Sequence, residues 1–481
     1  MENGELGYTV EDYRDGIPPR AFGTETEYTD NSDIERFIDD YIHGSKSRRL
    51  GYFVNPRYMV TAGRSEATSV ITSNGGEMYL DSATLEYATP ECRTPTETTL
   101  HERIGELIVN DTVQQIGRWR DVPTPKVYKR GGYITVWGDS RGAPLLRETS
   151  IGHHENYSSR SNLMQMGQYD LERDPAFRFM NTFLVLRKLI DGAGMVAEDH
   201  FSITQKPRAI NYCALESSTM HGKKKPFQQK EDRLEIRTGE GNKSDWANTF
   251  KIGLTSLVLR LMEHKQIPKD MNLYDPNVAI AQIAQNPLSA VTLASGERMR
   301  GIDVLSNIVE SAYDLAKNYD EMPEYEKQAY ADFVEFYDDI HKINLRQHDV
   351  SSLSDRIDWA ARYAFLVRTK EYNGLFTTDN LKLVQYDLLW DQIGDHDIAR
   401  KWFSKFGHTA LTATIALPPP TRAQTRVELI RDLDAQHKFK YASWGSVNAS
   451  DGTIYDLRHP LLPVYQARPE APIAPNNRDW M

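Results

Sequence analysis

Acidic residues that recur on short β-prone segments constrain the fold of this chain more than any other feature. Residues 21–28 read AFGTETEY, and the alternation of a strand places Glu25 and Glu27 on the same face. Later strand candidates carry Glu86 and Glu235. Carboxylates that point from one sheet face repel one another unless a cation lies between them. The pattern therefore indicates a sheet with an acidic face, provided that these strands are neighbours.

Two interpretations of these carboxylates remain open from the residues alone. A cluster of hard oxygen ligands suits Mg²⁺ or Mn²⁺, and either ion suits the phosphates of a nucleotide. Alternatively, the carboxylates are solvated residues on the exposed face of amphipathic strands. The run His153-His154-Glu155-Asn156-Tyr157 poses a similar choice. It either supplies a metal ligand and positions a substrate, or forms a hydrogen-bonded loop without a catalytic role.

Strand and helix signals alternate along the chain. Strand candidates lie at residues 77–81, 85–89, 200–206 and 232–238, and helix candidates at residues 34–42, 179–190, 246–263 and, in several pieces, 302–368. A further helix opens at the capping box Thr94-Pro95-Thr96-Glu97 and continues with apolar residues at helical spacing. Amphipathic strands interspersed with helices predict an α+β fold whose sheet is covered on one face by helices.

A run of prolines at residues 418–420 marks the clearest boundary in the chain. Thr421 and Gln424 then form a capping-box pattern at the start of a helix. Strand candidates follow on either side of a loop, at residues 439–444 and 453–457. We therefore expect three parts, which are an irregular leader at residues 1–19, a large domain at 20–414, and a small C-terminal domain with a tail at 415–481.

The composition argues against several classes of protein. The 481 residues carry a formal net charge of −11, which argues against a general nucleic-acid binder and against attachment to acidic lipid. No apolar run approaches the ~18 residues that span a bilayer, and the acidic N-terminus resembles neither a secretory signal nor a transit peptide. With only Cys92 and Cys213, no disulfide framework is expected. We therefore expect a cytoplasmic protein with neither nucleic acid nor membrane among its partners.

Longer motifs occur in an order that reveals a family resemblance. They are GTETEY (residues 23–28), NGGEMYLD (74–81), EYATPEC (86–92), LHERIGE (100–106), GHHENY (152–157), LRKLIDGAG (186–194), RLEIRTGEGN (233–242), KIGLTSLVL (251–259) and PPPTRAQTRVELI (418–430). In this order they resemble the Pup ligase and depupylase family, which belongs to the glutamine synthetase-like carboxylate–amine ligases. The resemblance extends from about residue 20 to about residue 465, with departures that would make this chain a divergent member.

The resemblance implies both a fold and an activity. The implied fold is a curved antiparallel sheet that cradles the active site, with helices behind it and a small C-terminal domain alongside. The implied cofactors are ATP and Mg²⁺. In the family, the γ-phosphate of ATP passes to the C-terminal glutamate of Pup, and a lysine amine then displaces phosphate to form an isopeptide bond. In the depupylase, the same site hydrolyses that bond.

The resemblance also implies roles for individual residues. Asp81 matches the family's aspartate that acts as base or nucleophile, and Arg233 matches an arginine suited to stabilising the charge of a transferring phosphate. The implied nucleotide-binding residues are Glu25, Tyr79, His154, Asn156 and Arg233. The implied metal ligands are Glu25, Glu27, Glu86, His154 and Glu235.

The chain departs from the family pattern at three places. Glu235 stands where the family has a histidine two residues after the arginine, and Thr84-Leu85 replaces the usual His-Pro. The family's Asn-Thr-Arg-Asp-Glu-Pro-His-Ala-Asp signature is missing, and residues 216–232 read ESSTMHGKKKPFQQKED instead. Because that segment lies close to the active site in the family, ATP and Mg²⁺ chemistry is better supported than Pup as the substrate.

Three activities remain open. The first joins an activated carboxylate of Pup to an amine acceptor, and the second phosphorylates or ligates a small carboxylate substrate. The third is amide hydrolysis of the depupylase kind. Depupylases carry a long insertion before the Asn-Gly motif, whereas residues 28–73 leave room only for a modest loop, so the ligase is favoured. A non-catalytic binding protein is disfavoured because Asp81, Glu25 and Arg233 are all retained.

Overall fold

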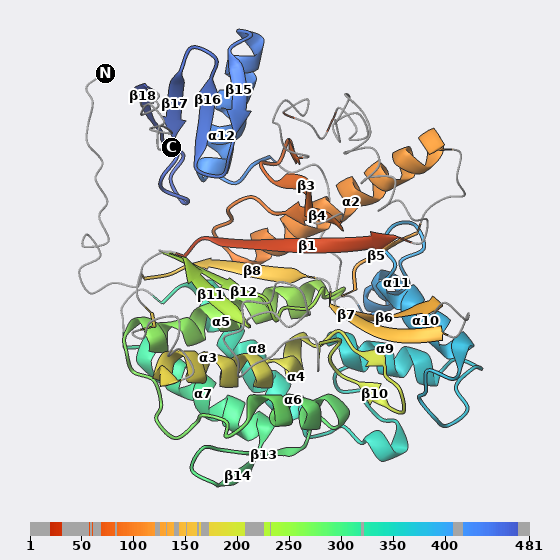
Figure 1. The fold of residues 1–481 in the computed structure, drawn as a ribbon. Helices are drawn as coiled ribbons and strands as arrows, with labels where there is room; N and C mark the ends of the chain where they lie inside the picture. Colours follow the sequence, from red (N-terminus) through yellow and green to blue (C-terminus); the bar gives the residue numbers. More distant parts are fainter. Residues whose placement is uncertain are drawn as a thin grey trace, which may run out of the picture.

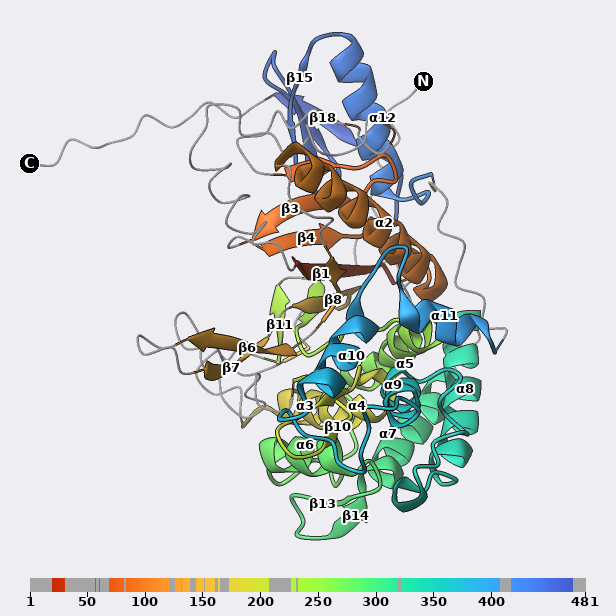
Figure 2. The same cartoon turned by 90° about the vertical axis from the view of Figure 1, so that its right-hand side faces the viewer.

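The computed structural model describes most of the chain. The described residues are 20–30, 57, 60, 69–81, 84–120, 126–130, 132–138, 144–150, 152–160, 163–164, 173–206, 226–230, 232–318, 322–406 and 417–469. They form the fold shown in Figures 1 and 2. The predicted leader at residues 1–19, the helix predicted at 34–42 and most of the altered segment at 216–232 lie outside the described residues.

An antiparallel sheet runs through the middle of the molecule, with strand order β11-β12-β8-β1-β4-β3-β2 (Figure 1). Its strands are β1 (Phe22–Asp30), β2 (Ser69–Ile71), β3 (Glu77–Asp81), β4 (Thr84–Ala88), β8 (His153–Ser158), β11 (Phe227–Lys230) and β12 (Arg233–Ile236), with β5 (Val127–Tyr128) paired to the end of β1. Strand β1 lies between β4 and β8 and pairs antiparallel with both. The strands predicted from the acidic segments are therefore confirmed; β1, β4 and β3 are neighbours, whereas β8 separates β12 from β1.

The two faces of this sheet differ because burial alternates along its strands. On β1, Thr24, Thr26 and Tyr28 are buried, whereas Glu25 and Glu27 between them are partly exposed. Helices α2 (Pro95–Arg120) and α5 (Asp245–Glu263) lie behind the buried face (Figure 2). The capping box predicted for α2 is present in modified form, because the N–H of Glu97 donates to Thr94 while the Glu97 carboxylate accepts from Arg93.

Further helices and small hairpins complete the main body. The helices are α3 (Pro175–Leu186), α4 (Lys188–Asp191), α6 (Pro276–Gln285), α7 (Gly301–Ala316), α8 (Glu324–Ile340), α9 (Asp358–Val367), α10 (Leu381–Asp391) and α11 (Ile398–Ser404). The hairpins are β6 (Gly132–Gly138) with β7 (Pro144–Ser150), β9 (Met195–Val196) with β10 (Phe201–Ser202), and β13 (Ala290–Thr292) with β14 (Arg298–Arg300). An antiparallel sheet covered by helices confirms the predicted α+β class. Among the described helices, none combines the length and the apolar character that crossing a bilayer requires.

Two predicted elements differ most from their observed extents. The helix predicted at 179–190 begins earlier, because Asp174 accepts hydrogen bonds from the N–H groups of Ala176 and Phe177 and caps the helix there. It is also divided into α3 and α4 at Arg187. The strand predicted at 200–206 is reduced to the two residues of β10.

The C-terminal residues form a smaller unit at one end of the sheet (Figure 1). This C-terminal unit (residues 417–469) contains α12 (Arg422–Ala435), β15 (Phe439–Ala442), β16 (Ser446–Ala449), β17 (Thr453–Asp456) and β18 (Gln466–Pro469). Thr421 caps α12 by accepting from the N–H of Ala423. The unit has a hydrophobic cluster of its own, which Ile71 of β2 joins. The domain boundary near residue 415 stays a prediction.

Candidate active site

The partly exposed face of the sheet brings polar residues of four strands together. The pairing register places Glu27 opposite Glu86, and Glu86 opposite Tyr79 of β3. On the other side of β1, Glu25 lies opposite His154 of β8. Directly opposed residues of antiparallel strands point to the same face. Segments that lie far apart in the sequence therefore supply one polar surface.

Glu25, Glu86 and His154 form a group whose potential ligand atoms all lie within 4.8 Å of one another. The Nδ1 atom of His154 lies 3.5 Å from Oε2 of Glu25. Glu86 is only 2% exposed, so its carboxylate lies at the base of the group. Carboxylate oxygens are the ligands that Mg²⁺ and Mn²⁺ prefer, and imidazole is a common additional ligand for transition metals. The donor set therefore fits a divalent cation.

The other two predicted metal ligands have protein partners. The Oε2 atom of Glu27 accepts a hydrogen bond of 2.6 Å from the N–H of Gly152. The Glu235 carboxylate accepts from Nε of Arg237 and from Nε2 of Gln228, both at 2.7 Å. Burial opposes ionisation, but these two hydrogen bonds and the Arg237 charge lower the pKa of Glu235 overall. Neither residue belongs to the three-residue group, and their roles as ligands stay predictions.

The pKa values of Tyr79 and Glu77 are raised on this acidic face of the sheet. Burial raises the pKa of the Tyr79 hydroxyl, and the charges of Glu25 and Glu86 raise it further. Burial also raises the pKa of the Glu77 carboxyl, although Ser69 and Arg426 oppose the shift. A cation bound nearby would favour the ionised form of each such group. The role of Tyr79 in nucleotide binding stays a prediction.

The two predicted catalytic residues lie on either side of β1. Asp81 is the last residue of β3 and pairs with Thr84, but its side chain lies outside the described part of the structure. Arg233 begins β12, and its Nη1 atom lies 3.8 Å from Oε1 of Glu25. Its side chain is 42% exposed, so it can change conformation and turn toward a substrate.

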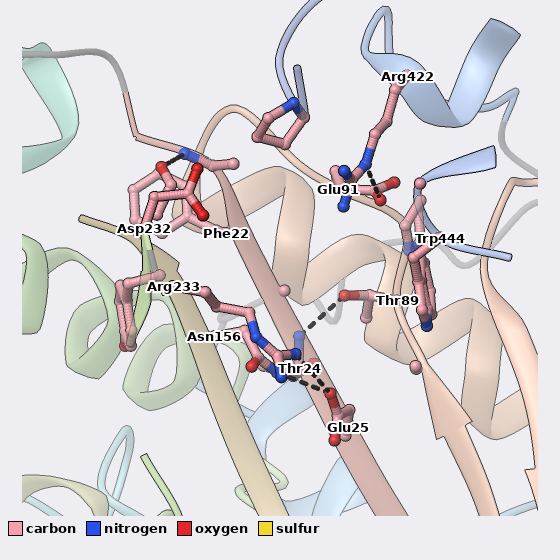
Figure 3. A pocket seen from close by; sticks show the side chains of 18 of the residues that line it. Phe22, Thr24, Glu25, Thr89, Glu91, Asn156, Asp232, Arg233, Arg422 and Trp444 are labelled. Carbon is pink, nitrogen blue, oxygen red and sulfur yellow. Dashed lines mark hydrogen bonds and ion pairs between the residues drawn. The ribbon is translucent and has the colours of Figure 1, made fainter. Parts of the chain in front are cut away.

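A pocket of about 410 Å³ opens beside the three-residue group (Figure 3). Glu25, Asn156 and Arg233, three of the predicted nucleotide-binding residues, line it. The Asn156 amide donates to Oε1 of Glu25 at 2.9 Å and so orients that carboxylate. The rest of the lining consists of Ala21, Phe22, Gly23, Thr24, Ala88, Thr89, Pro90, Glu91, Tyr157, Ser158, Asp232, Arg422, Trp444, Gly445, Arg458 and Pro460.

The far wall of this pocket comes from the C-terminal unit, and the sequence interpretation missed it. Arg422 and Trp444 lie across the opening from residues of β1, β4 and β8 (Figure 3), and Arg458 also belongs to the lining. The available signal was the PPPTRAQTRVELI motif, which contains Arg422 and which indicated the start of a helix and the family resemblance but no pocket residue. A pocket with aromatic and cationic groups on one wall and carboxylates at one end suits an anionic, ring-containing ligand.

Strand β8 is held from behind by buried charges. Arg187 donates to both oxygens of Glu155, at 2.6 and 2.8 Å. Burial opposes ionisation of Glu155, but the charges of Arg187 and Lys251 lower its pKa overall. Lys251 also lies 3.1 Å from Nε2 of His153. Since lysine only donates, Nε2 accepts and Nδ1 carries the imidazole hydrogen.

Comparison with known proteins identifies the family. The sequence model of the family described as Pup-ligase protein matches residues 11–448. The chain is 25% identical over 450 residues to the Pup deamidase/depupylase of Mycobacterium tuberculosis, covering 87% of this chain and 81% of that protein. It is 27% identical over 466 residues to the Pup–protein ligase of Renibacterium salmoninarum, covering 90% and 92%.

Solved structures agree with the fold. The complex between Pup and its ligase PafA superposes with a TM-score of 0.68 at 20% identity, covering 95% of this chain and 92% of that one. The Pup ligase PafA in complex with ADP superposes with a TM-score of 0.65 at 20% identity, covering 83% and 88%. Because the family model matches most of its length, the chain belongs to the Pup ligase family.

Proposed function

We propose that this protein is an ATP- and Mg²⁺-dependent enzyme that activates a glutamate side-chain carboxylate by phosphorylation and joins it to an amine. Membership of the Pup ligase family supports the general activity. The observation that carries the proposal is the position of Glu25, which belongs both to the pocket lining and to the three-residue group. A ligand in the pocket that extends toward Glu25 would bring its phosphates to a cation held there.

The pocket has the features that ATP requires. Its volume of about 410 Å³ falls within the range of small-molecule sites. The indole of Trp444 offers an apolar face for a purine base. Arg233 adds positive charge that matches phosphate oxygens, whereas Arg422 is paired with Glu91 at 2.6 Å. The relative solved with ADP supports a nucleotide as the ligand of this fold.

We assign the cation to Glu25, Glu86 and His154, whose donor atoms already converge. When bound, a Mg²⁺ ion would neutralise charge on the phosphates. To Glu27 and Glu235 we assign only a contribution of negative charge near the cation. Asn156 would orient the Glu25 carboxylate through its hydrogen bond of 2.9 Å.

The chemistry then requires two transfers. In the first, a substrate carboxylate oxygen attacks the γ-phosphorus, the bond to the β–γ bridging oxygen breaks, and ADP and an acyl phosphate form. Arg233 would stabilise the charge of the transferring group. In the second, Asp81 would accept a proton from the incoming amine, whose nitrogen attacks the acyl carbon. The bond to the phosphate oxygen breaks, which releases inorganic phosphate and leaves an amide.

For the substrate we favour the C-terminal glutamate of Pup, because relatives described as Pup–protein ligases match most of this chain. A depupylase-like hydrolase is a second candidate, since the depupylase of Mycobacterium tuberculosis is similar at nearly the same identity. A small carboxylate substrate is a third, because the family signature is replaced at residues 216–232.

Product analysis separates these candidates. The protein is incubated with ATP, Mg²⁺ and a lysine-bearing protein, with Pup ending in glutamate, with Pup ending in glutamine, or without Pup, and all products are followed by mass spectrometry. A ligase converts ATP to ADP and forms a conjugate only with Pup ending in glutamate. A depupylase instead deamidates Pup ending in glutamine without net ATP consumption, and turnover without Pup indicates a small substrate.

Two variants complete this experiment. Asp81→Asn should abolish turnover while leaving ATP binding intact, because an amide cannot accept the amine proton. Asp314→Asn makes the same change at an exposed position of α7 and should behave as wild type. Failure of the wild-type protein to bind or consume ATP under every condition would refute the proposed enzyme.

A further inference from the structure

Arg426 of α12 lies at the junction between the C-terminal unit and the pocket wall. Its side chain is 0% exposed although it carries a charge that normally lies in water. Its Nη1 and Nη2 atoms donate to the two carboxylate oxygens of Glu91, at 3.1 and 2.9 Å. Glu91 follows β4 and lines the pocket. This bidentate ion pair therefore joins the C-terminal unit to a pocket-lining segment of the sheet.

The same guanidinium also holds two backbone segments. Nη1 of Arg426 donates to the carbonyl of Trp444 at 3.0 Å, and Nη2 donates to the carbonyl of Gly75 at 2.7 Å. Its central carbon lies 4.7 Å from the centre of the Trp444 ring. One planar group with several fixed donors thus ties together Glu91, the wall residue Trp444, and the turn that precedes β3.

The turn before β3 is packed tightly against α12. Gly75 has φ of +85°, and a Cβ atom there would lie 2.9 Å from Cβ of Ala423. Glycine is therefore required for both the backbone conformation and the close approach. This turn leads directly into β3, which carries Tyr79 and ends at Asp81. Any shift of α12 relative to the sheet would move the start of β3.

We propose that Arg426 is a positioning residue that holds Trp444 and the turn at residues 72–76 in place around the pocket, so that the affinity for ATP depends on it. This inference rests on the proposed function, because it takes ATP as the pocket ligand. A merely structural role would lower the melting temperature without changing ATP affinity in the molecules that remain folded. The two roles are therefore separable by experiment.

The first test is Arg426→Lys. Lysine keeps the charge, but its single ammonium cannot reach Glu91, Gly75 and Trp444 together in the geometry of the guanidinium. We expect the dissociation constant of Mg·ATP, measured by displacement of a fluorescent ATP analogue, to rise about tenfold, which corresponds to the loss of one charge-assisted hydrogen bond. Turnover at saturating ATP should stay within about twofold. Arg431→Lys, at an exposed position of the same helix, is the matched control and should leave both values unchanged.

A spectroscopic readout tests the same inference through Trp444. The Trp444 emission is obtained by subtracting the spectrum of Trp444→Phe from that of the parent protein. In Arg426→Lys the indole of Trp444 should be more accessible to solvent, so acrylamide should quench its emission more strongly than in Arg431→Lys. If Arg426→Lys does not fold, Glu91→Gln serves instead, since it removes the charge that pairs with both Arg426 and Arg422 and should raise the same dissociation constant.

The outcomes separate this inference from the function on which it rests. Absence of ATP binding in the wild-type protein would overturn both. Wild-type binding together with unchanged ATP affinity and unchanged Trp444 quenching in the variants would overturn only the role of Arg426, even if their melting temperatures fall.

Discussion

His154 of β8 lies beside Glu25 of β1, with its Nδ1 atom 3.5 Å from Oε2 of that carboxylate. The two residues are register partners in neighbouring strands, and Glu86 approaches the pair from β4 on the other side of β1. The geometry of this group is therefore set by the pairing of three backbone strands. Substitutions within it should change ligand binding while leaving the sheet in place.

Substitution of Glu86 by glutamine tests the cation site. The amide oxygen of Glu86→Gln carries no charge, so the affinity for a divalent cation should fall by about tenfold or more. Titration with Mn²⁺ followed by electron paramagnetic resonance measures this affinity. Glu428→Gln, at an exposed position of α12, is the matched control. Equal Mn²⁺ affinity in both variants would remove Glu86 from the site.

Metal addition offers an independent test through stability. A cation that binds only the folded protein raises the free energy of unfolding by about 2.7 kcal/mol at a concentration 100 times its dissociation constant. The melting temperature of the wild-type protein should therefore rise with Mg²⁺, and it should rise less for Glu86→Gln. A melting temperature independent of Mg²⁺ in the wild-type protein would contradict the site.

Removal of the Arg233 guanidinium should affect catalysis more than binding. Arg233→Ala is expected to lower kcat about 100-fold, the size typical of losing one group that stabilises transition-state charge. Arg233→Lys should recover part of that loss because it restores the charge without the planar fork. Steady-state kinetics of ADP formation measure both variants, with exposed Arg298→Ala as control. Unchanged kcat in Arg233→Ala would exclude the residue from phosphate transfer.

The ion pair behind β8 should contribute to stability. Glu155 and Arg187 are both fully buried, so Glu155→Gln leaves the arginine with less compensation and should cost about 3–5 kcal/mol. Equilibrium unfolding in urea measures this cost for each single variant and for Glu155→Gln combined with Arg187→Gln. The double variant should lose less than the sum of the single losses, since neither charge then remains. If the loss of unfolding free energy in the double variant equals the sum of the two single losses, the two groups do not interact.

Buried His101 should make stability depend on acid pH. Burial lowers its pKa from 6.5 to about 4. Between these values the unfolded chain binds a proton and the folded protein does not, so stability falls as the pH drops through this range. At pH 5 the loss from this residue is about 2 kcal/mol relative to pH 7.

Replacement of this histidine isolates its contribution. His101→Gln should show a smaller loss of unfolding free energy between pH 7 and pH 5 than the wild-type protein, whereas His396→Gln, at an exposed position, should retain the full loss. Equal slopes for His101→Gln and the wild-type protein would rule out this origin of the acid sensitivity.

The two carboxylates of the three-residue group were predictable from strand alternation, whereas His154 was predicted as a ligand only from the family resemblance. Glu25 and Glu86 lie on predicted strands, and antiparallel pairing places both of them and His154 on the same face of the sheet. What the residues alone left open was whether the segments were neighbours. The family resemblance supplied that order, and the strand pairing confirms it.

The pocket wall was not predictable by the same reasoning. Trp444 and Arg422 lie more than 300 residues along the chain from Glu25, and no local pattern specifies that α12 packs against the turn at Gly75. Strand β16 was also missed, because its sequence SVNA is short and half polar and falls inside a predicted loop. Such features depend on tertiary packing.

Glu235 is a third case. The alternation of residues along the predicted strand placed its side chain on the correct face of the sheet but left its function open. Its carboxylate lies on the site face of β12 opposite Asn156, as the pattern predicted. Its hydrogen bonds go to Arg237 and Gln228. The sequence left open whether Glu235 is a metal ligand or a salt-bridge partner of Arg233 or Arg237, whereas nothing in the sequence pointed to Gln228.

The fate of the oxygen atoms of the substrate carboxylate shows whether the enzyme activates that carboxylate by phosphorylation. Pup that carries ¹⁸O in the side-chain carboxylate of its C-terminal glutamate is incubated with the enzyme, ATP, Mg²⁺ and a lysine-bearing protein. Phosphorylation of that carboxylate followed by attack of the amine sends one ¹⁸O atom into inorganic phosphate. We expect one ¹⁸O-labelled phosphate for each conjugate formed. Conjugate formed with unlabelled phosphate would contradict carboxylate activation, and absence of ADP and conjugate would contradict the ligase itself.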